Sequence, residues 1–265
     1  MNLRKITLWI LWLTGLLIVL AIADILFIPG TLSFLTPITT LSAFIFAVLH
    51  GGQRFGWSKV ILLVIVVFIV SIAFESLGVA TGKVYGPYHY TDRLGPKFLG
   101  LVPYLIPLAW FMMMYSSLVI AERFVLPAWS GRRWRWLAIS AVGSLAMTAW
   151  DLAMDPMMVL SNHWVWEVNG AYFGVPLQNY WGWWLTTFVA LGLFGLLGGS
   201  RRRTGKGERP LPPDAWAVTA YFLMGISSVV LDFIVHLYGP GLVGIFAMLP
   251  WVLVGYTSAS RRGNA

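Results

Sequence analysis

The sequence contains no cysteine, and charged residues make up only 11% of its 265 residues. Without cysteine the chain can form neither disulfides nor thiolate metal sites. Hydrophobic residues account for 58% of the chain and the mean hydropathy is +0.77, which is more apolar surface than a soluble domain can usually bury. The composition therefore predicts a polytopic membrane protein.

Apolar runs long enough to cross a bilayer recur along the whole chain. A spanning helix needs roughly 20 mostly apolar residues. Windows of this kind lie near residues 6–28, 33–50, 58–79, 101–122, 135–155, 181–199, 215–238 and 241–258. We expect an all-α fold of about eight transmembrane helices in four hairpins, with residues 1–265 forming a single transmembrane domain.

The basic residues are distributed unevenly between the two ends of these helices. With the N-terminus placed in the cytoplasm, fifteen Lys and Arg residues lie on the inner side, and only Lys83, Arg93 and Lys97 lie on the outer side. This positive-inside bias predicts cytoplasmic termini and a multi-pass protein of the cell membrane. The net charge of +8 then reflects topology and contact with anionic headgroups, which argues against a nucleic-acid partner.

The N-terminal segment has some features of a cleavable signal peptide. Arg4 and Lys5 precede an apolar run that ends in small residues at 21–24. However, the apolar run continues through 25–28, and removal of this segment would invert the charge distribution of the remaining chain. We therefore expect the first helix to be retained.

Motifs for several common chemistries are missing. No Gly-rich phosphate loop and no Ser/His/Asp order is visible. The acidic residues lack the dense spacing of a metal site, so we expect neither a metal nor another cofactor. The D-x-x-x-D spacing at 151–155 could hold Mg²⁺-diphosphate in a prenyltransferase, but the expected outer face has almost no Lys or Arg for the phosphates.

Several acidic residues lie within the apolar windows, where each costs at least ~2.5 kcal/mol to insert, and four of them are candidates for chemistry. Asp151 and Asp155 share a helix face, whereas Glu75 and Asp232 lie towards the outer ends of other helices. Because Pro156 disfavours helical geometry before it, we expect Asp155 at the end of its helix. Burial, the helix dipole and the like charge all favour a neutral carboxyl, as a proton donor requires. The alternative is that these acids only hydrogen-bond to tyrosine hydroxyls of the outer loops.

Aromatic residues are concentrated close to these acids in the sequence. The segment 162–184 carries five Trp and three further aromatic residues. An interfacial belt explains part of this, but aromatic faces also pack elongated apolar ligands and stabilise cations. Asn179 would anchor a water, His163 is expected at the loop surface, and His236 could pair with Asp232.

Four stretches resemble a known family. They are FESLGVATGKVYGPYHY at 74–90, GLVPYLIPLAWFMMMYSSLVIAE at 100–122, AWDLAMDPMMV at 149–159 and WVWEVNGAYFGVPLQNYWGWWLT at 164–186. These stretches are similar to the integral-membrane carotenoid biosynthesis family that contains the carotenoid 1,2-hydratases. The resemblance implies cofactor-independent addition of water to the terminal C1=C2 bond of an acyclic (ψ) carotenoid end group, of the lycopene, γ-carotene or bisanhydrobacterioruberin type.

Such a reaction needs a neutral acid, a cation-tolerant pocket and a group that orients and deprotonates water. On this resemblance we expect Asp151 or Asp155 to be the acid, and Glu75 or Asp232 to handle the water. The residues expected to bind the substrate are Tyr85, Tyr88, Trp150, Trp164, Trp166, Tyr172, Asn179 and Trp181. The implied partners are the carotenoid, water, the lipid bilayer and other membrane enzymes of the carotenoid pathway.

Other functions could use the same residues. An end-group cyclase begins with the same protonation but traps the cation with a neighbouring double bond. A proton-coupled transporter would use the acids as a relay, and a structural scaffold would not need them. Product analysis separates hydratase from cyclase, and uptake driven by a pH gradient would identify a transporter.

Overall fold

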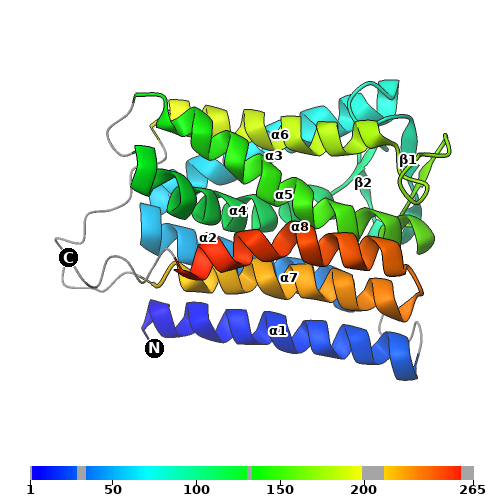
Figure 1. Cartoon of the computed structure of the whole chain (residues 1–265), viewed down its shortest axis with the longest axis horizontal. Coiled ribbons are helices and arrows are strands. Elements are labelled where there is room, and N and C mark those ends of the chain that lie inside the picture. The colour runs from blue at the N-terminus through cyan, green and yellow to red at the C-terminus, as the bar shows by residue number, and fades with distance from the viewer. Residues whose placement is uncertain (1, 29–33, 130–132, 199–211, 258–265) are drawn as a thin grey trace.

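The computed structural model describes residues 2–28, 34–129, 133–198 and 212–257. Within these ranges the chain forms eight α-helices that lie side by side as a bundle (Figure 1). They are α1 (Leu3–Phe27), α2 (Leu35–Phe55), α3 (Trp57–Thr81), α4 (Leu105–Trp129), α5 (Arg135–Leu160), α6 (Leu177–Leu196), α7 (Ala215–Ile234) and α8 (Tyr238–Thr257). The all-α, polytopic prediction is confirmed.

Seven of these helices, all except α6, are long and apolar enough to cross a membrane. α6 begins with polar and aromatic residues, which lower its mean hydropathy, yet it packs along α3 and α5 within the bundle (Figure 1). α1 begins and α8 ends at the same end of the bundle, as expected for an even number of crossings (Figure 1). The orientation in the membrane stays a prediction, and part of the basic residues behind it, such as Arg132 and Arg201, lie outside the described residues.

α4 lies at the centre of the bundle. It packs against α2, α3, α5, α7 and α8, and every residue from Trp110 to Glu122 is buried. An apolar surface on all sides of a helix is typical of such a central position. Helices that follow each other in the chain pack closely in the pairs α1–α2, α5–α6 and α7–α8. α3 packs against α4, as several other helices do.

The helix ends differ from the predicted windows by a few residues, and one difference affects the site. α5 continues to Leu160, past Pro156, so Asp155 lies inside the helix and the expectation that it lies at the end was wrong. Pro156 has no amide hydrogen and cannot bond to the carbonyl of Leu152, four residues earlier. The hydroxyl of Tyr172 donates to that carbonyl at 2.9 Å, which satisfies the freed acceptor and lets the helix continue.

Short strands tie two long connections together at one end of the bundle (Figure 1). β1 (Tyr88–Tyr90) pairs antiparallel with β4 (Trp164–Trp166), and the register places Tyr88 opposite Trp166 and Tyr90 opposite Trp164. The first connection also contains the 3-10 helix η1 (Asp92–Leu94) and the ribbon of β2 (Lys97–Phe98) with β3 (Val102–Pro103). The β1–β4 pairing brings aromatic residues of both connections over the helix ends.

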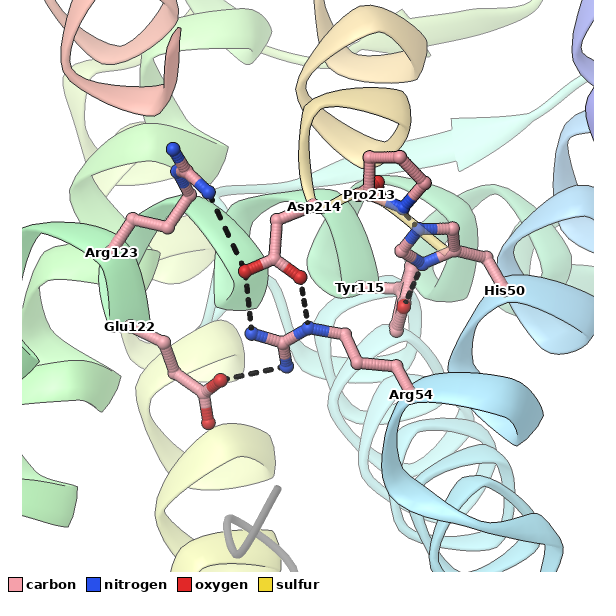
Figure 2. Close-up of polar contacts among 7 residues, drawn as sticks. All are labelled: His50, Arg54, Tyr115, Glu122, Arg123, Pro213 and Asp214. Atoms are coloured by element: carbon pink, nitrogen blue, oxygen red, sulfur yellow. Dashed lines mark hydrogen bonds and ion pairs between the residues drawn. The ribbon is translucent and has the colours of Figure 1, made fainter. Parts of the chain in front are cut away.

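A buried ion network joins three helices at the opposite end (Figure 2). Arg54 of α2 is 1% exposed; its Nη1 lies 2.7 Å from Glu122 Oε2 of α4, and its Nε donates to Asp214 Oδ1 at 2.7 Å. Asp214 directly precedes α7 and lies 3.5 Å from Arg123 Nη1. Because the charges are paired, the apolar bundle can bury them.

His50 reinforces the same junction. Its Nδ1 lies 2.5 Å from the Tyr115 hydroxyl of α4, and its Nε2 lies 3.1 Å from the carbonyl of Pro213 (Figure 2). From the sequence, Arg54 lies beyond the predicted window 33–50 and is one of the fifteen basic residues expected on the inner side. In the structure it is a buried residue of α2, because α2 extends beyond its predicted window to Phe55.

Replacement of Arg54 tests this network. We expect Arg54→Met to lower the free energy of unfolding by about 3–5 kcal/mol, because it removes the cation that Glu122 and Asp214 share. Thermal unfolding in detergent measures the loss. The exposed Lys5 provides a control, since Lys5→Met should change stability by less than about 0.5 kcal/mol. Equal stability of the two variants would contradict this role of the network.

Candidate active site

A cavity of about 280 Å³ lies within the bundle and is lined by residues of α1 to α7. Most of its wall is apolar, and residues of β1 and β4 close it at one end. The aromatic and sulfur-containing side chains that line it are Tyr85, Tyr88, Tyr90, Trp110, Trp150, Trp164, Trp166, Trp183, Met112, Met154, Met157, Met158 and Met224. Two carboxyl groups, those of Glu75 and Asp155, also face this cavity.

Asp151 and Asp155 form a buried pair on α5. Asn179, at the start of α6, donates through Nδ2 to both acids, at 2.8 Å to Asp151 Oδ2 and 2.7 Å to Asp155 Oδ2. Trp164 Nε1 donates to the other oxygen of Asp155 at 2.6 Å. Asp155 and Asn179 reach the cavity, whereas Asp151 lies one turn deeper behind its wall. The predicted i, i+4 pairing is therefore real, and a single amide holds it.

Glu75 of α3 lies on another part of the cavity wall and accepts three hydrogen bonds. Tyr88 and Tyr90 donate to Oε2, the latter at 2.8 Å, and Trp110 Nε1 donates to Oε1 at 2.8 Å. Burial and the Glu75 carboxylate raise the pKa of both tyrosines well above the ordinary value. These phenols therefore stay protonated near neutral pH and act as donors.

Aromatic rings line the cavity that Glu75 and Asp155 both face. Trp110 stacks on Trp183 with ring centroids 4.1 Å apart, and Trp150 meets Trp183 edge-on at 5.9 Å. Trp110, Trp183 and Tyr90 were not among the residues predicted from the sequence to bind the substrate. All three lie within the stretches that carry the family resemblance, but residue type alone does not tell which face of a helix points inward.

The structure places two expected substrate-binding residues outside the cavity. Trp181 is 59% exposed and stacks on Trp184. Because residues two apart on a helix point in nearly opposite directions, Trp183 takes the inward position instead. Tyr172 does not line the cavity either, since its hydroxyl is bound to the backbone of α5. The other expected residues, Tyr85, Tyr88, Trp150, Trp164, Trp166 and Asn179, do line it.

The remaining titratable residues of this end are distributed differently from expectation. Asp232 is fully buried but does not line the cavity, and His236 bonds to the Tyr238 hydroxyl at 2.7 Å rather than to Asp232. His163, expected at the surface, lines the cavity; burial and Arg93 lower its pKa, so the ring is neutral. Within the described ranges no group of three His, Cys, Asp or Glu side chains is placed to hold a metal ion.

A bundle of apolar helices around a cavity of acids and aromatic rings defines a membrane protein suited to chemistry on an apolar ligand. The family model described as carotenoid biosynthesis protein matches residues 32–250, so the chain belongs to this family. A region of 127 residues is 33% identical to the bisanhydrobacterioruberin hydratase of Haloarcula japonica. That match covers 48% of this chain and 41% of the relative. No solved structure matches the chain.

The shared amide contact of the acid pair is testable. We expect Asn179→Leu, which keeps the side-chain shape, to lower the free energy of unfolding by about 1–3 kcal/mol, because it leaves buried carboxyl oxygens without a donor. Thermal unfolding in detergent measures this. Gln178→Met is the matched control, since the neighbouring amide is exposed and bonds only to loop carbonyls. A loss no greater than that of the control would contradict the structural importance of the bridge.

Proposed function

We propose that the protein is a hydratase that adds water across the terminal C1=C2 double bond of an acyclic (ψ) carotenoid end group. The observation that carries this proposal is the presence of Asp155, backed by Asp151, in the wall of an apolar and aromatic cavity within a carotenoid biosynthesis family. The name of the similar H. japonica protein supports the reaction type. Protonation of C2 gives a tertiary cation at C1, water forms the C–O bond, and a proton returns to the protein.

The acid pair on α5 supplies the proton. Two adjacent buried carboxyls resist simultaneous ionisation, so the pair retains one proton between them. Asn179 and Trp164 donate to Asp155 and fix its orientation toward the cavity. Asp155 is the proton donor because it lines the cavity, and Asp151 exchanges the proton with it from behind.

Glu75 and the rings handle the cation and the water. An ionised carboxylate has about four lone-pair sites, and Tyr88, Tyr90 and Trp110 occupy three of them. One site is left to orient a water and accept its proton. The faces of Trp110 and the neighbouring rings stabilise the cation until the water attacks.

The hydrocarbon chain enters from the bilayer of the cell membrane, a location that the distribution of basic residues supports. α1 contributes Ile18, Ala21, Ile22 and Ile25 to the cavity and packs mainly on α2 and α7. The cavity is thus separated from lipid by a single apolar helix, past which a polyene can reach Asp155 without crossing water. The long remainder of the substrate lies among the Met side chains, whose flexible thioethers adapt to irregular shapes.

Expression in a lycopene-producing bacterium tests the reaction. We expect pigments that are heavier by one or two waters, detected by mass spectrometry and absent from the host with an empty vector. Cyclised pigments of unchanged mass would identify a cyclase instead. Unchanged pigment with lycopene, with γ-carotene and with bisanhydrobacterioruberin would contradict the proposal.

Substitution of the proton donor tests the assignment of roles. We expect Asp155→Asn to lower the hydration rate at least 100-fold, because general acids contribute roughly 10²–10⁴-fold. Initial rates are compared in membranes that contain equal amounts of protein. Glu167→Gln is the control, because Glu167 is exposed in the loop beyond β4 and should leave the rate unchanged. Full activity of Asp155→Asn would refute its role as the acid even if hydration itself is observed.

A further inference from the structure

Several polar atoms are buried behind the cavity wall without a hydrogen-bond partner among the described residues. They are Asp151 Oδ1, the Tyr180 hydroxyl and both carboxyl oxygens of Asp232. Asp232 is 0% exposed, as is Asp151. A buried polar atom that lacks any partner costs about 1–3 kcal/mol, and nearly all such atoms in folded proteins bind either protein groups or ordered water.

Tyr172 lies among these atoms. Its hydroxyl donates to the Leu152 carbonyl of α5, and its ring meets that of Tyr180 edge-on with centroids 5.3 Å apart. Burial, followed by the Asp232 and Asp151 carboxylates, raises the pKa of Tyr172 to about 12. One phenol is therefore within electrostatic reach of an acid of α5 and an acid of α7.

The contact between α5 and α7 supports this placement. Trp150 Nε1 donates to Ser228 Oγ at 3.2 Å, and Ser228 lies one helical turn before Asp232 on the same face of α7. Leu231 and Ser228 line the cavity, whereas Asp232 does not. Asp232 thus lies behind the cavity wall, and its Cβ lies beside Gly241 of α8.

The cluster also reaches the loop surface. Tyr172 is only partly buried and belongs to the tight loop in which Tyr172 bridges to Val175 and Gly170 to Gly174. Tyr172 therefore connects this loop to α5, through the Leu152 carbonyl, and to the ring of Tyr180 on α6. The hydrocarbon cavity reaches the acid pair from the other side, past Asp155.

We propose that Asp232, Tyr172 and Tyr180 form a water-binding site that supplies water to the Asp151–Asp155 pair by a route separate from the hydrocarbon path. The orphaned oxygens offer the two to four polar partners that a buried water needs. This inference rests on the proposed hydratase function. One water from the site adds to the C1 cation and its oxygen forms the new C–O bond, while its spare proton passes to Glu75, the base of the proposed function, and from there back to the acid pair.

Two variants separate water supply from protonation when lycopene is incubated with the protein in D2O. We expect Asp232→Asn and Tyr180→Phe to lower formation of the hydrated product at least tenfold. Protonation at C2 persists in them, so the cation loses a proton and recovered lycopene gains deuterium at no less than half the wild-type rate. Tyr221→Phe is the matched control, because this buried phenol already donates to the Ala146 carbonyl at 2.7 Å.

The outcomes are distinct. Wild-type hydration rates in both variants would overturn the inference, and so would a parallel loss of hydration and deuterium uptake in folded protein, because protonation itself would then depend on these groups. A wild type that forms no hydrated carotenoid would refute the proposed function, and the inference with it.

Radiolytic footprinting provides a readout that does not depend on activity. X-ray pulses convert bound water into hydroxyl radicals that label adjacent side chains. We expect Tyr180 to be labelled at least fivefold faster than Tyr221, and Asp232→Asn to reduce that ratio. Equal labelling of the two tyrosines would overturn the water site even if the variants fold poorly.

Discussion

Burial of ionisable side chains in an apolar bundle is the constraint on which the rest of this structure depends. Each such group needs a partner, and the partners come from helices far apart in the sequence. At one end Arg54 joins α2, α4 and the start of α7, and at the other Asn179 joins α6 to the acids of α5. At both ends of the bundle, the contacts that pair the buried polar groups therefore also join the helices to one another.

The two ends pair their buried groups differently, and α4 takes part in both sets of contacts. Glu122 of α4 takes part in a network of opposite charges, whereas Trp110 of the same helix donates to Glu75 beside the cavity. These residues lie roughly 18 Å apart along the helix axis. The first end pairs opposite charges, whereas the carboxyls at the other end accept hydrogen bonds mainly from neutral donors.

The sequence predicted the helices and the shared face of Asp151 and Asp155 well, because both follow from local rules. Apolar runs gave eight helices, and the spacing of Asp151 and Asp155 gave a shared face. The errors arose where tertiary contacts decide. Trp181 and Trp183 are the same type of residue, and only the packing of α6 in the bundle decides that Trp183 points inward. Pro156 predicted a helix end because the phenol of Tyr172, which replaces the missing backbone hydrogen bond, belongs to a loop outside this helix. Nothing local links Arg54 to Asp214, which lies 160 residues further along the chain.

The contact between Tyr172 and the Leu152 carbonyl has a consequence for how such sequences can vary. An ordinary residue at position 156 would bond to that carbonyl itself, and the phenol of the loop would lose its anchor on α5. Positions 156 and 172 are thus thermodynamically coupled, so their substitution effects should not add. A homologue that lacks the imino acid does not need the tyrosine to complete the backbone hydrogen bonds of α5, so the bond from Tyr172 to Leu152 should be lost where Pro156 is lost.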